Sequence, residues 1–517
     1  MLYLQPPVYA FLWSVLVFSL GRFAKTVLRV VVGWLWLFEL ADLFTRLFLG
    51  LHICADLFMI LFGSSPEELE VFLRNYAGWK AVLFLLFWGV CLIPFWFVSA
   101  RFSFPRGCRG LRGVAVAASG LTLVLLWRIE SFNALMYSAV IVRTAEDIRV
   151  IADQKAISEH PQVSSTFSID SDCSPIGVFV IGESATRNHM GVYGYSRDTT
   201  PGLSRRSQEL FWFRDLVGAA PGTQPGVRFL LTLATVEAPK EGRMALPWAL
   251  AQAGYGVDLV SSQTKWGGRE NVTSMLFRPC RSRVYLNEKI NGRYYDDALL
   301  PYVDDFVKCS GKGRGDFLFL HLSGNHFPWH EACPDEQRRY ASDFRDAITA
   351  HVPDAVCTSI NDYDSSVVFT DSVLSRIIDA LERVGRPAFM IYVPDHGETP
   401  DSGSMRQGKD RNLWEIPFVV WLSAEYRKQN PQLVSRLEKA QFIPIQSDQL
   451  FYGILELALV AETPRDLMRS NSFLSPEFAV KSRRMICDGT VCYEDAFARP
   501  GSRGTGYESG NDQKQIQ

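Results

Sequence analysis

Five apolar runs crowd the first 130 residues of this 517-residue chain. They fall at residues 8–21, 26–41, 46–63, 79–100 and 112–127. Because a helix needs about 20 apolar residues to cross the hydrocarbon of a bilayer, several runs approach the required length. Trp79 to Ala100 is the clearest of them. A large buried helical core is the alternative, but the density of Leu, Phe and Trp favours a membrane domain.

Basic residues in the loops set the expected orientation of these spans. Arg101, Arg106, Arg109 and Arg112 lie between the last two runs. Positively charged loops stay in the cytoplasm, so the last span delivers everything after about residue 130 to the far side of the membrane. With five spans, Arg22 would lie near the outer face, which conflicts with the same rule. The expected count is therefore five, or four if the first hairpin is one long span.

Beyond these runs the composition is that of a globular α/β protein. Short apolar runs alternate with helical patterns, and the strands they predict are Ile176–Ile181, Val257–Val260, Phe317–Leu322, Ala388–Val393 and Ile416–Leu422. The clearest helix extends from Asp362 to Arg383 and is ended by Gly385 and Pro387. Such alternation predicts a mostly parallel sheet flanked by helices.

Four segments are expected along the chain. They are a transmembrane helical domain at 1–130, an amphipathic connector at 131–172, a globular α/β domain at 173–480 and a C-terminal segment at 481–517 with a disordered tail. The connector would lie on the membrane surface or pack on the globular domain.

The net charge of −2 points to no nucleic-acid partner. Scattered cysteines beyond the membrane suggest disulfides, and Cys487 with Cys492 could close a small loop.

Three predicted strands end in residues that bind metals or phosphates. The first ends in Gly182-Glu183-Ser184, the third in a stretch from His321 to His326, and the fourth in Pro394-Asp395-His396. Ligands in open α/β sheets bind beyond the carboxyl ends of the strands, and Asp and His are zinc ligands. Each stretch alone would suit an ordinary turn. Three at one edge of a sheet indicate a site.

Thr223 lies in a stretch that predicts the start of a helix. Gly222 lets the backbone turn, Pro225 fits a first helical turn, and an apolar run follows from Val227 to Leu233. The free amides and dipole at such a terminus favour a phosphate. A hydroxyl that also contacted zinc would lose its proton more easily and become a nucleophile. The plainer interpretation, a threonine that only caps the helix, is common.

These blocks together resemble the membrane phosphoethanolamine transferases of the alkaline phosphatase and sulfatase superfamily. The run from Gly182 through Glu183-Ser184 to Thr199-Thr200-Pro201 is similar to the family's signature. Other matches follow in the family's order: Thr223 with Leu231-Thr232, Asn325-His326-Phe327-Pro328, Tyr363-Asp364-Ser365-Ser366, Asp395-His396-Gly397-Glu398 and Glu415-Ile416-Pro417. The resemblance covers about residues 174–470 in motif and the helical N-terminal anchor in layout.

The resemblance implies one zinc ion and a covalent mechanism. The implied ligands are Glu183, Thr223, Asp395 and His396, and their three oxygens and one nitrogen suit tetrahedral zinc. Thr223 would attack phosphatidylethanolamine, leaving diacylglycerol. The phosphoethanolamine on Thr223 would then pass to a hydroxyl or amine of an acceptor.

The resemblance also implies substrate-binding side chains. His326 would offset charge on the phosphoryl oxygens, and Lys265 would do the same. Many members have a further histidine after the Asp-His-Gly-Glu block, but no histidine follows His396 in this chain. The side chains that could hold phosphate there are Gln407, Arg406 and Lys409. Whether one or two metals bind stays open.

The expected function is transfer of phosphoethanolamine to an envelope acceptor such as lipid A, a lipopolysaccharide core sugar or a protein. The enzyme would lie in a bacterial inner membrane with its catalytic domain in the periplasm. A phosphoglycerol transferase or phosphodiesterase of the same superfamily is the second interpretation, and Thr199-Thr200-Pro201 favours the first. A membrane scaffold with a degenerate site is the third, and retention of all four implied ligands argues against it.

Overall fold

The computed structural model describes residues 166–169, 174–239, 244–263, 272–288, 294–310, 315–402, 410–464, 466–487 and 489–497. The chain divides into two compact units, 1–152 and 153–517, and all the described residues belong to the second. The expected membrane spans, most of the connector and the C-terminal tail lie outside the described residues. Within the described part, no helix combines the length and apolarity needed to cross a bilayer.

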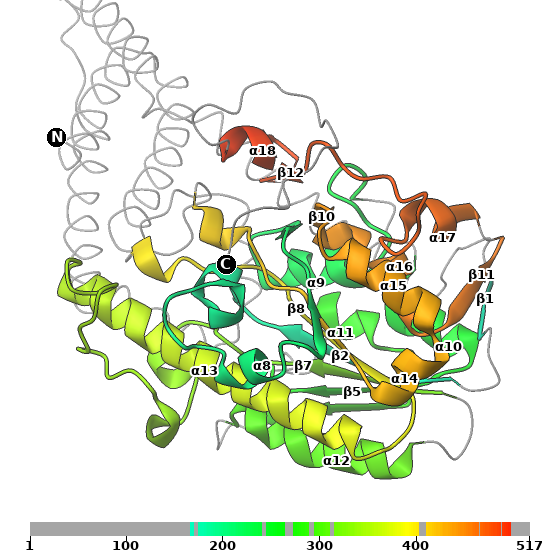
Figure 1. Ribbon diagram of the computed structural model, residues 1–517, viewed down its shortest axis with the longest axis horizontal. Coiled ribbons are helices and arrows are strands. Elements are labelled where there is room, and N and C mark those ends of the chain that lie inside the picture. Colours follow the sequence, from blue (N-terminus) through cyan, green and yellow to red (C-terminus); the bar gives the residue numbers. More distant parts are fainter. Residues whose placement is uncertain are drawn as a thin grey trace, which may run out of the picture. The chain divides into compact units, whose positions relative to one another are not determined.

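A seven-stranded sheet lies at the centre of the described unit (Figure 1). Its strands, in spatial order, are β3 (Leu210–Trp212), β9 (Val419–Leu422), β8 (Ala388–Pro394), β2 (Ile176–Gly182), β7 (Asp316–His321), β5 (Gly256–Ser261) and β6 (Ser282–Tyr285). From β8 to β6 neighbouring strands are parallel, whereas β9 pairs antiparallel with β8 and β3. The mostly parallel sheet and its five predicted strands are confirmed, with ends shifted by a few residues. Strands β3 and β6 were not predicted.

Helices cover both faces of this sheet (Figure 1). One face packs against α8 (Pro201–Arg205), α12 (Leu300–Cys309) and α13 (Asp354–Glu382). The other packs against α9 (Thr223–Leu231), α10 (Leu246–Ala253), α11 (Val272–Leu276), α14 (Ala424–Gln429), α15 (Pro431–Ala440) and α16 (Phe451–Leu457). Strand β2 is buried on both sides, with Val178 and Val180 facing the first layer and Phe179 and Ile181 the second. This is why the strand reads as a continuous apolar run.

The long helix α13 begins earlier than predicted. It starts at Asp354, directly after Pro353, whereas the sequence pattern placed the start at Asp362. Its first turn carries an acidic residue, which the helix dipole favours. Of the apolar residues in its early turns only Cys357 and Ile360 are buried, so hydrophobic spacing did not reveal these turns. The predicted end is close, because Gly385 takes a left-handed conformation just beyond the helix.

Three two-stranded sheets accompany the central sheet in the described part of the unit. They are β1 (Thr166–Ile169) with β11 (Val460–Thr463), β4 (Leu216–Val217) with β10 (Ile445–Gln446), and β12 (Met485–Ile486) with β13 (Val491–Cys492). Strand β1 lies inside the stretch expected as a connector. The segment after residue 481 also includes α18 (Tyr493–Ala496), and α17 (Asp466–Asn471) precedes it. Ile486 and Tyr493 pack against Val217 and Trp414 in a small core of their own.

The described cysteines do not bear out the suggested disulfide loop. Cys492 is a free thiol whose Sγ lies 3.3 Å from the Glu494 carboxylate, so Cys487 and Cys492 are not joined in this structure. Cys280, Cys309, Cys333 and Cys357 are free thiols as well.

Candidate active site

Strand register brings Glu183 and Asp395 together. Gly182 at the end of β2 pairs with Pro394 at the end of β8, so the next residue on each strand is a carboxylate at the same edge of the sheet. The Asp395 amide donates to the Gly182 carbonyl at 3.1 Å, and the Ser184 amide donates to Asp395 Oδ1 at 3.1 Å. Ser184 adopts a positive φ of 53°, which turns the chain sharply after Glu183.

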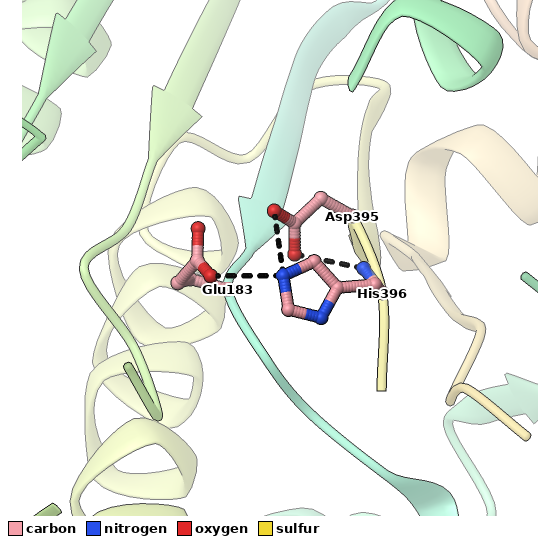
Figure 2. A group of neighbouring side chains, drawn as sticks. All are labelled: Glu183, Asp395 and His396. Carbon is pink, nitrogen blue, oxygen red and sulfur yellow. Dashed lines mark hydrogen bonds and ion pairs between the residues drawn. The ribbon is translucent and has the colours of Figure 1, made fainter. Parts of the chain in front are cut away.

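His396 points one ring nitrogen at both carboxylates (Figure 2). Its Nε2 lies 3.3 Å from Glu183 Oε1 and 3.6 Å from Asp395 Oδ2. Its Nδ1 lies 2.7 Å from the Gly397 carbonyl, which can only accept a hydrogen bond. Nδ1 therefore carries the proton, and in the neutral ring Nε2 has its lone pair directed into the site. Glu183, Asp395 and His396 are each at most 1% exposed.

Thr223 reaches this group from the start of α9. It is the first residue of the helix, as the sequence predicted, and extended Gly222 precedes it. Its Oγ1 lies 3.2 Å from Glu183 Oε2 and 3.3 Å from Oε1. Gly226, one turn on, allows the helix to press against Asp395, since a Cβ there would lie 2.4 Å from the Asp395 carbonyl oxygen. The close helix packing thus sets the Thr223 hydroxyl against the Glu183 carboxylate.

The charge of the site suits a cation. Burial alone would raise the pKa of Glu183, but when His396 is protonated its hydrogen bond and charge, with the charge of His326, hold that pKa well below its usual range. Burial and the negative charge of Glu183 raise the pKa of Asp395. Asp395 Oδ2 is buried and has no hydrogen-bond partner among the described residues. Glu183, Asp395 and His396 can each offer one ligand atom, and these three atoms lie within 4.8 Å of one another. The three residues therefore fit a metal ion.

The remaining predicted site residues divide into two groups. His326 is half-buried beyond β7, and its Nδ1 hydrogen-bonds to the neighbouring Phe327 carbonyl. It is near enough for its charge to lower the pKa of Glu183. Lys265 and Gln407 lie outside the described residues, as do Arg406 and Lys409. The structure therefore brings together the four implied ligands, with His326 beside them, and leaves the other roles as predictions.

The supporting roles of two residues, Gln263 and Tyr363, were not predicted from the sequence. Gln263, just after β5, donates from Nε2 to Glu183 Oε2 at 3.0 Å and to the Leu322 carbonyl at 2.9 Å. The sequence signal that could have indicated this role was its position just beyond β5, a strand that ends at the same edge of the sheet as β7. Tyr363 on α13 donates to the Ser184 carbonyl at 2.9 Å and accepts from the Thr186 amide at 2.9 Å. Its hydroxyl therefore holds the turn after Glu183 in place.

Fold and site together define a class of protein. Residues 175–460, more than half of the chain, match the Sulfatase family, and the chain belongs to that family. The predicted place in the alkaline phosphatase and sulfatase superfamily is thereby confirmed.

Particular relatives narrow the comparison. Phosphoethanolamine transferase EptC of Escherichia coli O18:K1:H7 is 23% identical over 463 residues, covering 81% of this chain and 78% of the relative. Phosphoethanolamine transferase EptA of Helicobacter pylori is 28% identical over 313 residues, covering 56% of this chain and 55% of the relative. The predicted resemblance to phosphoethanolamine transferases is confirmed by these similarities.

Solved structures of such relatives share the fold. The C-terminal periplasmic domain of EcEptC from Escherichia coli, in complex with Zn, superposes with a TM-score of 0.56 at 25% identity, covering 62% of this chain and 91% of that domain. The integral membrane protein lipooligosaccharide phosphoethanolamine transferase A (EptA) from Neisseria meningitidis gives a TM-score of 0.62 at 19% identity, covering 92% of this chain and 90% of that one.

Proposed function

We propose that this chain transfers phosphoethanolamine from phosphatidylethanolamine to a lipopolysaccharide or other envelope acceptor. The observation that carries the proposal is the contact of the Thr223 hydroxyl with Glu183, which itself clusters with Asp395 and His396 at one edge of the sheet. The names of the relatives support the transferred group. The predicted N-terminal spans fit a donor that stays in the bilayer, with the enzyme in a bacterial inner membrane and its catalytic domain in the periplasm.

Zinc fits the donor set of the proposed site. Glu183, Asp395 and Thr223 would supply oxygens and His396 a nitrogen, and Asp395 Oδ2, which accepts no hydrogen bond from the described residues, is free to ligate a cation. The zinc-containing EcEptC domain supports this choice of metal. When bound, the ion would lower the pKa of the Thr223 hydroxyl and offset charge on the phosphoryl oxygens.

Thr223 then does the chemistry in two displacements. In the first, its Oγ1 attacks the phosphorus of the donor, the bond from phosphorus to the diacylglycerol oxygen breaks, and diacylglycerol leaves as the alcohol after taking a proton. In the second, an acceptor hydroxyl or amine attacks the same phosphorus, and Thr223 leaves and regains its proton. His326 would stabilise the phosphoryl oxygens in both steps. The position of Thr223 at the start of α9 suits a nucleophile that attacks phosphorus, because the free backbone amides there favour a phosphate.

The test is the covalent half-reaction. After incubation of full-length protein with phosphatidylethanolamine, intact mass and peptide mapping should locate a phosphoethanolamine adduct on Thr223, with release of diacylglycerol. Thr223→Ala should fold normally and form neither product. Thr235→Ala, a threonine shortly after the same helix, is the matched control and should behave as wild type. An active Thr223→Ala enzyme would refute the covalent mechanism, and reaction with phosphatidylglycerol alone would refute the donor.

A further inference from the structure

Asp296 is a buried carboxylate at the same edge of the sheet as the candidate ligands, yet it is none of them. It is the first residue of η6 (Asp296–Leu299) and is 2% exposed. Its Oδ1 accepts a hydrogen bond from the Ser323 amide at 2.9 Å, and its Oδ2 accepts one from the Gly324 amide at 2.8 Å. Two successive backbone amides of the loop after β7 are thus held by one side chain.

The opposite side of this loop presses directly on Glu183. Gly324 has a φ of 47°, and a Cβ there would lie 2.9 Å from the Glu183 carbonyl oxygen. The Asn325 amide donates to the same carbonyl at 3.0 Å. The loop is therefore clamped between Asp296 and Glu183, and His326 follows immediately. Any movement at Ser323 and Gly324 would shift His326 relative to Glu183.

A second arm connects Asp296 to the end of β5. Ser262 Oγ donates to Asp296 Oδ1 and accepts from the Ser323 amide at 2.8 Å. Ser323 Oγ in turn donates to the Ser262 carbonyl at 3.0 Å. The next residue is Gln263, which hydrogen-bonds to Glu183. The same carboxylate therefore joins the ends of β5 and β7.

We infer that Asp296 is a positioning residue that fixes the loop of His326 against Glu183 for phosphoryl transfer, an inference that rests on the function proposed above. Only a carboxylate offers two acceptor oxygens to two amides at once. An asparagine has one acceptor and an NH2 group that would face an amide donor. A displacement of about 1 Å at a reacting group is enough to slow catalysis strongly.

The experiment is a double-mutant cycle on the full-length enzyme, with diacylglycerol release from phosphatidylethanolamine as the rate. Asp296→Asn should lower kcat roughly tenfold or more with KM within about twofold, because Asp296 does not touch the donor. Zinc content should stay at the wild-type value. His326→Ala should be slower by roughly 100-fold, and adding Asp296→Asn to it should cause no further loss. Asp297→Asn removes the adjacent carboxylate and should leave kcat unchanged.

A milder variant keeps the test decisive if Asp296→Asn fails to fold. Ser262→Ala deletes only the hydroxyl bridge and should lower kcat roughly threefold, again with no effect in the His326→Ala background. Wild-type kcat in the folded variants, losses that multiply with His326→Ala, or loss of zinc would overturn the positioning role while the proposed function stood. A wild-type enzyme that releases no diacylglycerol would overturn the proposed function, and this inference with it.

Discussion

The two oxygens of the Asp395 carboxylate have different surroundings. Oδ1 accepts from the amides of Ser184 and His396, at 3.1 and 2.8 Å, so it organises the turn between strand and site. Oδ2 has no hydrogen-bond partner among the described residues. Oδ1 therefore stabilises the backbone turn, whereas Oδ2 is available to bind a metal ion.

This division predicts the behaviour of Asp395→Asn. The amide oxygen can replace Oδ1 and keep both backbone hydrogen bonds, but the NH2 group at the place of Oδ2 cannot ligate a metal. We expect a folded protein whose zinc content falls several-fold below one ion per chain. Elemental analysis with a melting curve checks this, with Asp297→Asn as the control. Full zinc occupancy in Asp395→Asn would exclude this residue as a ligand.

His189 gives a prediction about pH. It is buried, and its Nδ1 lies 2.7 Å from Asp364 while its Nε2 lies 3.1 Å from Asp401. Burial lowers its pKa, but the hydrogen bonds and charges of Asp364 and Asp401 outweigh this and raise the pKa to about 9. Arg197 and Tyr195 contact the other oxygen of Asp364. A pKa raised in the folded state stabilises it fully below the unfolded value of about 6.5. That stability is lost as the pH rises through about 9.

The unfolding free energy should therefore decrease by at most about 3 kcal/mol between pH 6.5 and pH 9.5, and the melting temperature should decrease with it. The glutamine in His189→Gln cannot gain a proton, so the melting temperature of this variant should decrease less over the same range. His330→Gln alters an exposed histidine and should match wild type. Thermal unfolding of the detergent-solubilised full-length protein at both pH values measures this. An equal slope in wild type and His189→Gln would contradict the assignment.

At the scale of elements, the sequence predicted the strands better than the contacts between them. Apolar runs located β2, β5, β7, β8 and β9, and Gly222 with Pro225 located the start of α9. The side chains at strand ends followed, because parallel strands share an edge. The support given by Gln263 and Asp296 could not be predicted, since it depends on side-chain directions across strands distant in sequence. The early turns of α13 were missed because polar contacts of Asp354 and Asn361 help to hold them, and the buried Cys357 and Ile360 form no long apolar stripe.

Helix α9 provides a prediction at this scale. Alanine normally favours a helix over glycine by about 0.5–1 kcal/mol. At Gly226, however, a Cβ would lie 2.4 Å from the Asp395 carbonyl oxygen, and backbone cannot easily move aside. Gly226→Ala should therefore cost about 1–3 kcal/mol of stability and displace Thr223. We expect transfer to slow at least tenfold.

The matched control is Gly218→Ala. The nearest atom to a Cβ at Gly218 is 3.6 Å away, an ordinary contact, so neither stability nor transfer should change much. Melting curves and the rate of diacylglycerol release measure both variants. Wild-type transfer in Gly226→Ala would show that close packing of α9 does not position the hydroxyl.

At the scale of the whole molecule, the expected membrane orientation can be tested through cysteines. Cys309 is exposed at the end of α12, whereas Cys333 and Cys357 are buried. Cys108 lies in the arginine-rich loop expected in the cytoplasm. A membrane-impermeant maleimide should label Cys309 in cells with a permeabilised outer membrane. Cys309→Ser should reduce that signal, leaving what the half-buried Cys280 and Cys487 contribute, and Cys108 should react only after the inner membrane is broken. Labelling in the reverse order would overturn the predicted orientation.

The pairing of β1 with β11 has a consequence for the order in which the chain is made. Thr166 pairs with Thr463, roughly 300 residues later. During synthesis, β1, the first strand among the described residues, must therefore wait unpaired until nearly all of the described unit has been made. An unpaired strand edge invites wrong partners during this interval. Strand β1 is only four residues long, which limits that exposure. Pairing with β11 joins the start of the described unit to a segment near its end. A chain truncated before β11 would therefore leave β1 without its partner strand.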